Sequence, residues 1–135
     1  MPYEIAFTRP ITIKDRDEYF NECCVGGDQV VDALLPAVRA RYDDIQDNQE
    51  DWGWFIWFKR GDVSLAIDIH TDDPDIGAFR VHLYSRKKRL WFFSQEVDTP
   101  ELEELRQLVE ADLRQWQVRS RWDHSVDRGS PGHRH

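Results

Sequence analysis

The stretch that decides the fold is Trp52-Gly53-Trp54-Phe55-Ile56-Trp57-Phe58. Its large apolar side chains occupy consecutive positions, which is typical of a strand covered on both faces. Alternating apolar and polar residues follow over 63–69 and 79–83. A period of two indicates strands, since successive side chains point to opposite faces of a sheet. Turn-like segments at 59–62, 71–78 and 86–89 separate these runs, so the region predicts an antiparallel meander.

The turns also predict the register of the strands. A two-residue hairpin with its tip at Arg60-Gly61 would place Phe58 opposite Val63 and Trp54 opposite Ile67. One face of the sheet is then apolar and is expected to form the core, with Trp52, Trp54, Ile56, Phe58, Val63, Leu65, Ile67, Ile69, Phe79, Val81, Leu83, Leu90 and Phe92.

Helical patterns precede the meander. A short helix is predicted over 12–24, with Phe20 on its apolar side, before Gly26-Gly27 ends it. A second helix, capped by Asp28, is predicted to run to about residue 42 on the spacing of its apolar residues. Pro36 lies inside that pattern and predicts a kink or a break there.

A third helix follows the meander. Thr99 can cap it, Pro100 suits its first position, and its apolar stripe predicts an end near Val118. Residues 43–51 are polar without periodicity and are predicted as a loop, whereas Tyr3–Thr8 alternates and is predicted as an edge strand.

These elements predict an α+β fold. It would contain about four to five antiparallel strands, with the helices packed on one face of the sheet. Residues 1–118 are expected to form a single domain. Residues 119–135 carry few apolar side chains and are predicted to be a disordered C-terminal tail.

Composition excludes some classes of function. The net charge of −8 argues against a partner held through phosphates, so no nucleic acid is expected. No apolar run approaches the roughly 20 residues that span a bilayer, so no membrane is expected either. The two cysteines are the neighbours Cys23 and Cys24, which fits a reducing compartment, and the protein is predicted to be cytoplasmic.

The face of the sheet opposite the core mixes aromatic, small and titratable side chains. Aromatic residues and arginine are enriched in protein interfaces, and exposed apolar patches usually mark interaction sites. Either a partner or the folded-back termini are expected to cover this face. Its predicted residues are Phe55, Trp57, Ser64, Ala66, Asp68, His70, Arg80, His82, Tyr84, Trp91 and Phe93.

Four titratable residues of that face are predicted to converge, namely Asp68, His70, His82 and Tyr84. A carboxylate beside an imidazole is the minimum for general acid–base catalysis. However, the sequence contains no nucleophile motif, no phosphate-binding glycine loop and no metal-ligand spacing. Neither a metal nor a cofactor is therefore predicted.

Charge is predicted to differ between the ends of the sheet. Lys59-Arg60 and the segment 86–89 would form a basic end. The opposite end would be acidic and could steer a charged partner. Its predicted members are Asp43, Asp44, Asp47, Glu50, Asp51, Asp72, Asp73 and Asp75, joined by Glu96 and Asp98.

The pattern favours a non-enzymatic module that binds another protein, either a basic partner that it would neutralise or a second copy of the chain in a homodimer. Trp57 would be the central anchor of such an interface. The predicted binding residues are Phe55, Trp57, Arg80, Tyr84, Trp91, Phe93, Asp72, Asp73 and Asp75. The alternative is a small-molecule-binding or hydrolase-like protein that uses Asp68, His82 and Tyr84.

Overall fold

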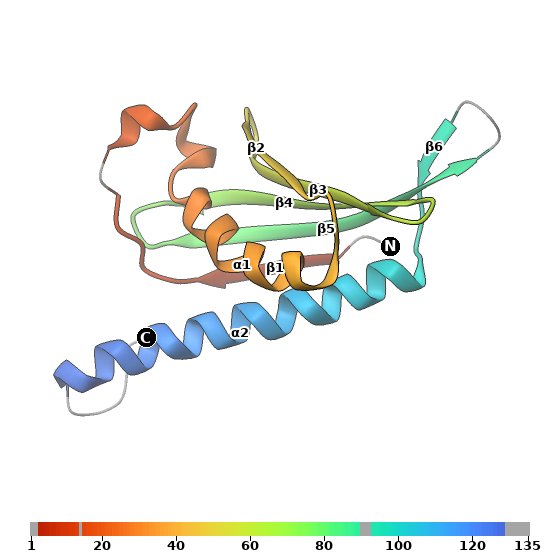
Figure 1. Cartoon of the computed structure of the whole chain (residues 1–135). Helices are drawn as coiled ribbons and strands as arrows, with labels where there is room; N and C mark the ends of the chain where they lie inside the picture. The colour runs from red at the N-terminus through yellow and green to blue at the C-terminus, as the bar shows by residue number, and fades with distance from the viewer. Residues whose placement is uncertain (1–2, 14, 90–92, 129–135) are drawn as a thin grey trace.

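The computed structural model describes residues 3–13, 15–89 and 93–128, with side chains described there except at 88–95 and 117–128. The strands form one antiparallel sheet in the order β1-β5-β4-β3-β2, with β6 paired to β5. Both helices lie on one side of the sheet (Figure 1), which confirms the predicted α+β fold. In chain order the elements are β1 (Tyr3–Thr8), the 3-10 turns η1 (Arg16–Glu18) and η2 (Glu22–Cys24), α1 (Gly27–Arg41), β2 (Gln46–Glu50), β3 (Gly53–Arg60), β4 (Val63–Asp73), β5 (Ala78–Arg89), β6 (Phe93–Glu96) and α2 (Pro100–Arg128).

The prediction is right for one edge strand of the sheet and wrong for the other. The predicted edge strand Tyr3–Thr8 is confirmed as β1, which pairs with β5. Residues 43–51, predicted as a loop, contain β2, which pairs with β3 along its whole length. The prediction is wrong there because β2 has no apolar alternation, and main-chain hydrogen bonds to β3 define it instead.

The register of the central hairpin differs from the prediction by two residues. Gly61, with φ of +63°, lies in the turn, so Arg60 pairs with Val63 and Phe58 with Leu65. A shift of two residues keeps every side chain on its predicted face, whereas a shift of one would have exchanged the faces. The predicted alternation of the meander therefore survives the error in the turn.

Trp52 is the exception to that alternation. It precedes Gly53, whose φ of +145° is a conformation that residues with a Cβ rarely adopt. A Cβ at Gly53 would also collide with the carbonyl oxygen of Ile69. This break ends the strand, so Trp52 is 46% exposed while Trp54 packs against the core. The predicted core position of Trp52 is wrong.

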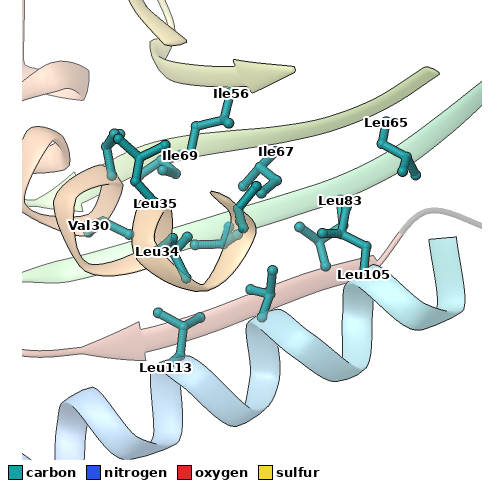
Figure 2. Packing of buried hydrophobic residues seen from close by; sticks show 14 of the residues in the cluster. Val30, Leu34, Leu35, Ile56, Leu65, Ile67, Ile69, Leu83, Leu105 and Leu113 are labelled. Carbon is teal, nitrogen blue, oxygen red and sulfur yellow. The ribbon is translucent and has the colours of Figure 1, made fainter. Parts of the chain in front are cut away.

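The core lies between the helices and the inner face of the sheet (Figure 2). α1 is continuous through the exposed Pro36, so the helix is not broken there. The buried stripe on the inner side of α1 anchors residues both before and after this proline. The two helices contribute Val30, Val31, Leu34, Leu35, Val38, Leu102, Leu105, Val109, Leu113 and Trp116 to the core.

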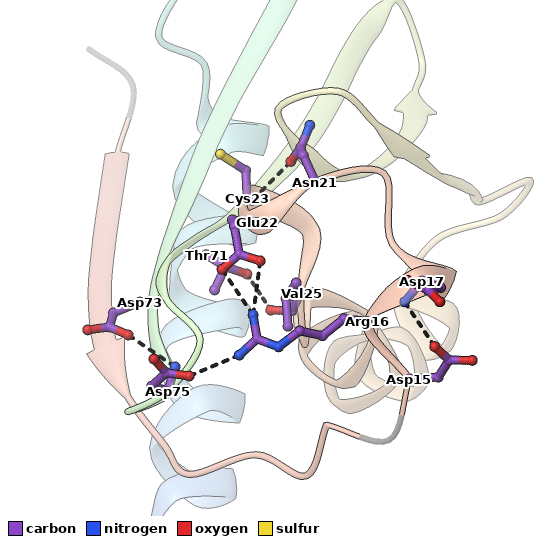
Figure 3. Close-up of polar contacts among 10 residues, drawn as sticks. All are labelled: Asp15, Arg16, Asp17, Asn21, Glu22, Cys23, Val25, Thr71, Asp73 and Asp75. Atoms are coloured by element: carbon purple, nitrogen blue, oxygen red, sulfur yellow. Dashed lines mark hydrogen bonds and ion pairs between the residues drawn. The ribbon is translucent and has the colours of Figure 1, made fainter.

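The segment before α1 is not the predicted helix over 12–24. It forms two 3-10 turns, in which the side chains of Asp15 and Asn21 accept hydrogen bonds from backbone N–H groups two residues later (Figure 3). Phe20 is 62% exposed, so it does not pack on an apolar side of a helix as predicted. Asp28 does not cap α1, because the helix begins one residue earlier, at Gly27, with Gly26 at the cap position. The Asp28 carboxylate instead accepts a hydrogen bond from the Tyr19 hydroxyl at 2.8 Å.

α2 begins as predicted and ends later. Thr99 Oγ1 accepts a hydrogen bond of 3.0 Å from the backbone N–H of Leu102, which satisfies one free donor of the first turn. The helix continues past Val118 to Arg128, so the predicted tail starts inside it. Among the described residues, neither helix has the length and apolar content needed to cross a bilayer.

Candidate binding surface

The face of the sheet away from the helices, called here the outer face, carries the candidate site. Strand pairing aligns its side chains in rows across β5, β4 and β3. One row contains His82, Asp68 and Phe55, and the next contains Tyr84, Ala66 and Trp57. Directly opposed residues of antiparallel strands have Cβ atoms about 5 Å apart, so each row is a set of contacting neighbours.

Aromatic rings gather on the β3 side of this face. The rings of Phe55 and Trp57 are stacked, with centroids 4.8 Å apart. Trp52 extends the group, because its ring and that of Phe55 are nearly perpendicular, with centroids 6.0 Å apart. The sequence pattern missed Trp52, although the glycine that follows it is a signal for broken alternation. The three residues form a partly exposed aromatic patch.

Asp68 lies beside that patch, and its side chain is only 22% exposed. One carboxylate oxygen, Oδ1, is buried without a hydrogen-bond partner. The other, Oδ2, is 3.7 Å from Nδ1 of His82, which is longer than a hydrogen bond. Burial raises the pKa of Asp68, and the charge of His82 and hydrogen bonding from the Trp52 side chain partly oppose that shift. A buried polar group left unsatisfied costs about 1–3 kcal/mol, so this carboxylate destabilises the fold unless something binds it.

Tyr84 completes the outer face on the β5 side. Its ring lies 5.3 Å from that of His82, and the guanidinium of Arg86 lies 5.8 Å from the Tyr84 ring centroid. Burial and the charge of Asp68 raise the pKa of Tyr84. The phenol is therefore held in its neutral form, which suits a binding contact better than attack as a phenolate.

His70 makes its contacts apart from Asp68, His82 and Tyr84, the residues with which it was predicted to converge. Its Nδ1 lies 2.9 Å from the carbonyl oxygen of Trp52, and its Nε2 lies 3.5 Å from Asp72 Oδ1. Arg80 donates through Nε to both oxygens of Asp72 at 3.0 Å, and these hydrogen bonds hold the pKa of Asp72 below its usual value. Asp68, His82 and Tyr84 come together as predicted, whereas His70 belongs to this second cluster.

Part of the acidic charge at the predicted acidic end is already paired. Arg16 forms an ion pair of 2.9 Å with Asp75, and the Asp73 side chain accepts a hydrogen bond from the Asp75 N–H (Figure 3). Together with the Asp72–Arg80 pair, these contacts occupy the acidic turn between β4 and β5.

Several residues predicted at the acidic end lie elsewhere. Glu96 pairs with Arg86 across β5 and β6, near the basic end, because residues 86–89 extend β5 instead of turning. Asp43 and Asp44 follow α1, whose Arg41 carbonyl accepts a hydrogen bond from Arg60 at that same basic end. The predicted polarity is therefore wrong for these three acids.

Three predicted residues of the last strand lack a described position. Leu90, Trp91 and Phe92 lie outside the described residues, and Phe93 begins β6 without a described side chain. Within the described part of the chain, no group of three or more His, Cys, Asp and Glu side chains could hold a metal ion. The described part of the candidate binding surface therefore lies on β3, β4 and β5, with Trp52 just before β3.

Comparison with protein-family models, with curated proteins and with solved structures finds no match to this chain.

Proposed function

We propose that this protein is a non-enzymatic binding module whose outer sheet face docks a basic protein partner. One observation carries the proposal: a largely buried carboxylate, Asp68, lies beside a partly exposed aromatic patch on a face that neither helix covers. Aromatic side chains that surround a fixed polar group are typical of the centre of a protein interface.

The charge of the chain supports a basic partner. Its net charge of −8 would attract a cationic protein and accelerate their encounter. Because Asp72 and Asp75 are already paired with Arg80 and Arg16, the acidic turn is a weaker candidate for direct contact than Asp68.

The second candidate is a small-molecule-binding or hydrolase-like function at Asp68, His82 and Tyr84. The cross-strand pairing of Asp68 with His82 favours it. Their separation of 3.7 Å counts against it, because it is longer than the hydrogen bond by which a carboxylate orients a catalytic histidine. A saturable thermal shift with a small molecule, abolished by His82→Ala, would support this function instead.

The proposal is tested by capturing partner proteins from a lysate of the source cell on the purified, immobilised protein. The double variant Phe55→Ser, Trp57→Ser removes two of the three rings of the aromatic patch, and Ile76→Ser removes an apolar side chain that is 57% exposed in the β4–β5 turn. A basic protein held by the parent and by Ile76→Ser, but not by the double variant, would be purified for binding titrations with all three. Equal affinity for the double variant and the parent would refute the proposal.

A further inference from the structure

We infer that the outer face receives an arginine side chain of the basic partner, with the guanidinium paired to Asp68 and lying against the rings of Phe55 and Trp57. The inference rests on the proposed function and adds the chemistry of its central contact. It follows from three features of the face: a carboxylate oxygen without a hydrogen-bond partner, flat rings beside it, and no Arg or Lys among the described side chains within ion-pair distance of it.

The hydrogen-bonding of Asp68 is incomplete in the described part of the chain. Among the described side chains, His82 is the one basic group within ion-pair distance of Asp68, and at 3.7 Å it makes no hydrogen bond. Arg80, two residues along β5, already binds Asp72 and Glu4. Hydrogen bonding from the Trp52 side chain lowers the pKa of Asp68, yet the buried Oδ1 has no hydrogen-bond partner, so the carboxylate can still accept a donor there.

A guanidinium fits this deficit better than an ammonium. It is planar, offers parallel N–H groups to both oxygens of a carboxylate, and stacks on aromatic faces. Asp68 pairs directly with Phe55 across β3 and β4, and Trp57 is its diagonal neighbour within reach of a long side chain. A modest turn of the carboxylate, whose terminal torsion is soft, would present both oxygens to the same guanidinium.

The neighbouring aromatic position already shows this kind of contact. Arg86 of the chain lies over the Tyr84 ring at 5.8 Å. Its guanidinium thus occupies the β5 side of the face and leaves the Phe55–Trp57 stack, on the other side of Asp68, for the partner. The 4.8 Å stacking of these two rings holds them in place before binding, which lowers the entropy lost in the contact.

The test is an NMR titration of the full chain with N-acetyl-arginine amide at millimolar concentrations. N-acetyl-citrulline amide has nearly the same shape without the positive charge. N-acetyl-lysine amide has the positive charge on an ammonium, without a planar group. The indole N–H signals of Trp52 and Trp57, and the backbone N–H of Asp68, report on the site. The matched variants are Asp68→Asn and Asp32→Asn, which remove the same charge, the second from an exposed position on α1.

We expect saturable chemical-shift changes with the arginine compound. Binding should be about tenfold weaker when the citrulline compound replaces it or when the protein carries Asp68→Asn, because each change removes one charge-assisted hydrogen bond. Asp32→Asn should bind like the parent. Equal binding of citrulline or lysine, or an unchanged Asp68→Asn, would overturn the inference. If no compound binds while the capture experiment still identifies a partner of the aromatic patch, the inference fails and the proposed function stands. If that partner is absent too, both fail.

Discussion

Replacing Asp68 with asparagine should stabilise the folded protein at neutral pH. The Asp68 side chain is 22% exposed, its Oδ1 has no hydrogen-bond partner, and burial raises its pKa. Asparagine keeps the shape and removes the buried charge. Because leaving a buried polar group unsatisfied costs about 1–3 kcal/mol and the neutral amide retains part of that cost, we expect a gain of about 1 kcal/mol in the free energy of unfolding.

The same reasoning fixes the pH dependence of the gain. A raised pKa means that the folded protein holds the Asp68 proton more tightly than the unfolded chain. Stability therefore falls as the pH rises above the unfolded pKa of about 3.9, until the folded carboxyl has also ionised. Below that window both states are protonated. The advantage of Asp68→Asn should be present at pH 7 and should disappear as the pH approaches about 3.9.

Urea denaturation of the parent, Asp68→Asn and the surface control Asp32→Asn, at neutral and at acidic pH, measures this effect. The control should follow the parent because Asp32 is exposed on α1. A gain of about 1 kcal/mol also raises the melting temperature by a few degrees. If Asp68→Asn is less stable than the parent at neutral pH, the carboxylate has a partner in solution, and the unsatisfied state of Oδ1 is refuted.

Three other substitutions separate the core from the outer face. Leu105→Ala should destabilise by about 2–5 kcal/mol, because Leu105 is fully buried and leaves a cavity; an unchanged denaturation midpoint would contradict its place in the core. Gly53→Ala should cost about 1–3 kcal/mol because of the positive φ and the collision with the Ile69 carbonyl, and a neutral thermal melt would contradict that strain. Trp57→Ala should leave the monomer folded while it dissociates any complex or homodimer, as sedimentation would show, since the ring packs on the outer face; an unfolded variant would contradict this placement.

The strands that carry the site could be predicted because their pattern has a period of two. The central hairpin turn is misplaced by two residues, yet Phe55, Trp57 and Asp68 still share a face, since side-chain direction depends only on parity. Trp52 could not be placed by that rule, because the φ of Gly53 ends the alternation.

The remaining errors concern polar segments, whose structure leaves no periodic pattern in the sequence. β2 exists because β3 offers main-chain partners, and none of its side chains indicates this. The turns before α1 depend on local caps by Asp15 and Asn21, which produce no periodicity. The missing hydrogen bond of Asp68 is likewise invisible in the sequence, because it depends on what β3 and β5 place around the carboxylate.

Under the proposed function, the inner face of the sheet serves stability and the outer face serves binding. The inner face and both helices form the hydrophobic core, so substitutions there act on folding. On the outer face Asp68 has the opposite effect, since the fold loses stability by burying it. In the proposed complex, the partner would supply a donor to the unpartnered Oδ1 of Asp68. The same substitution, Asp68→Asn, should therefore raise stability and lower binding, whereas a merely structural residue would lose stability.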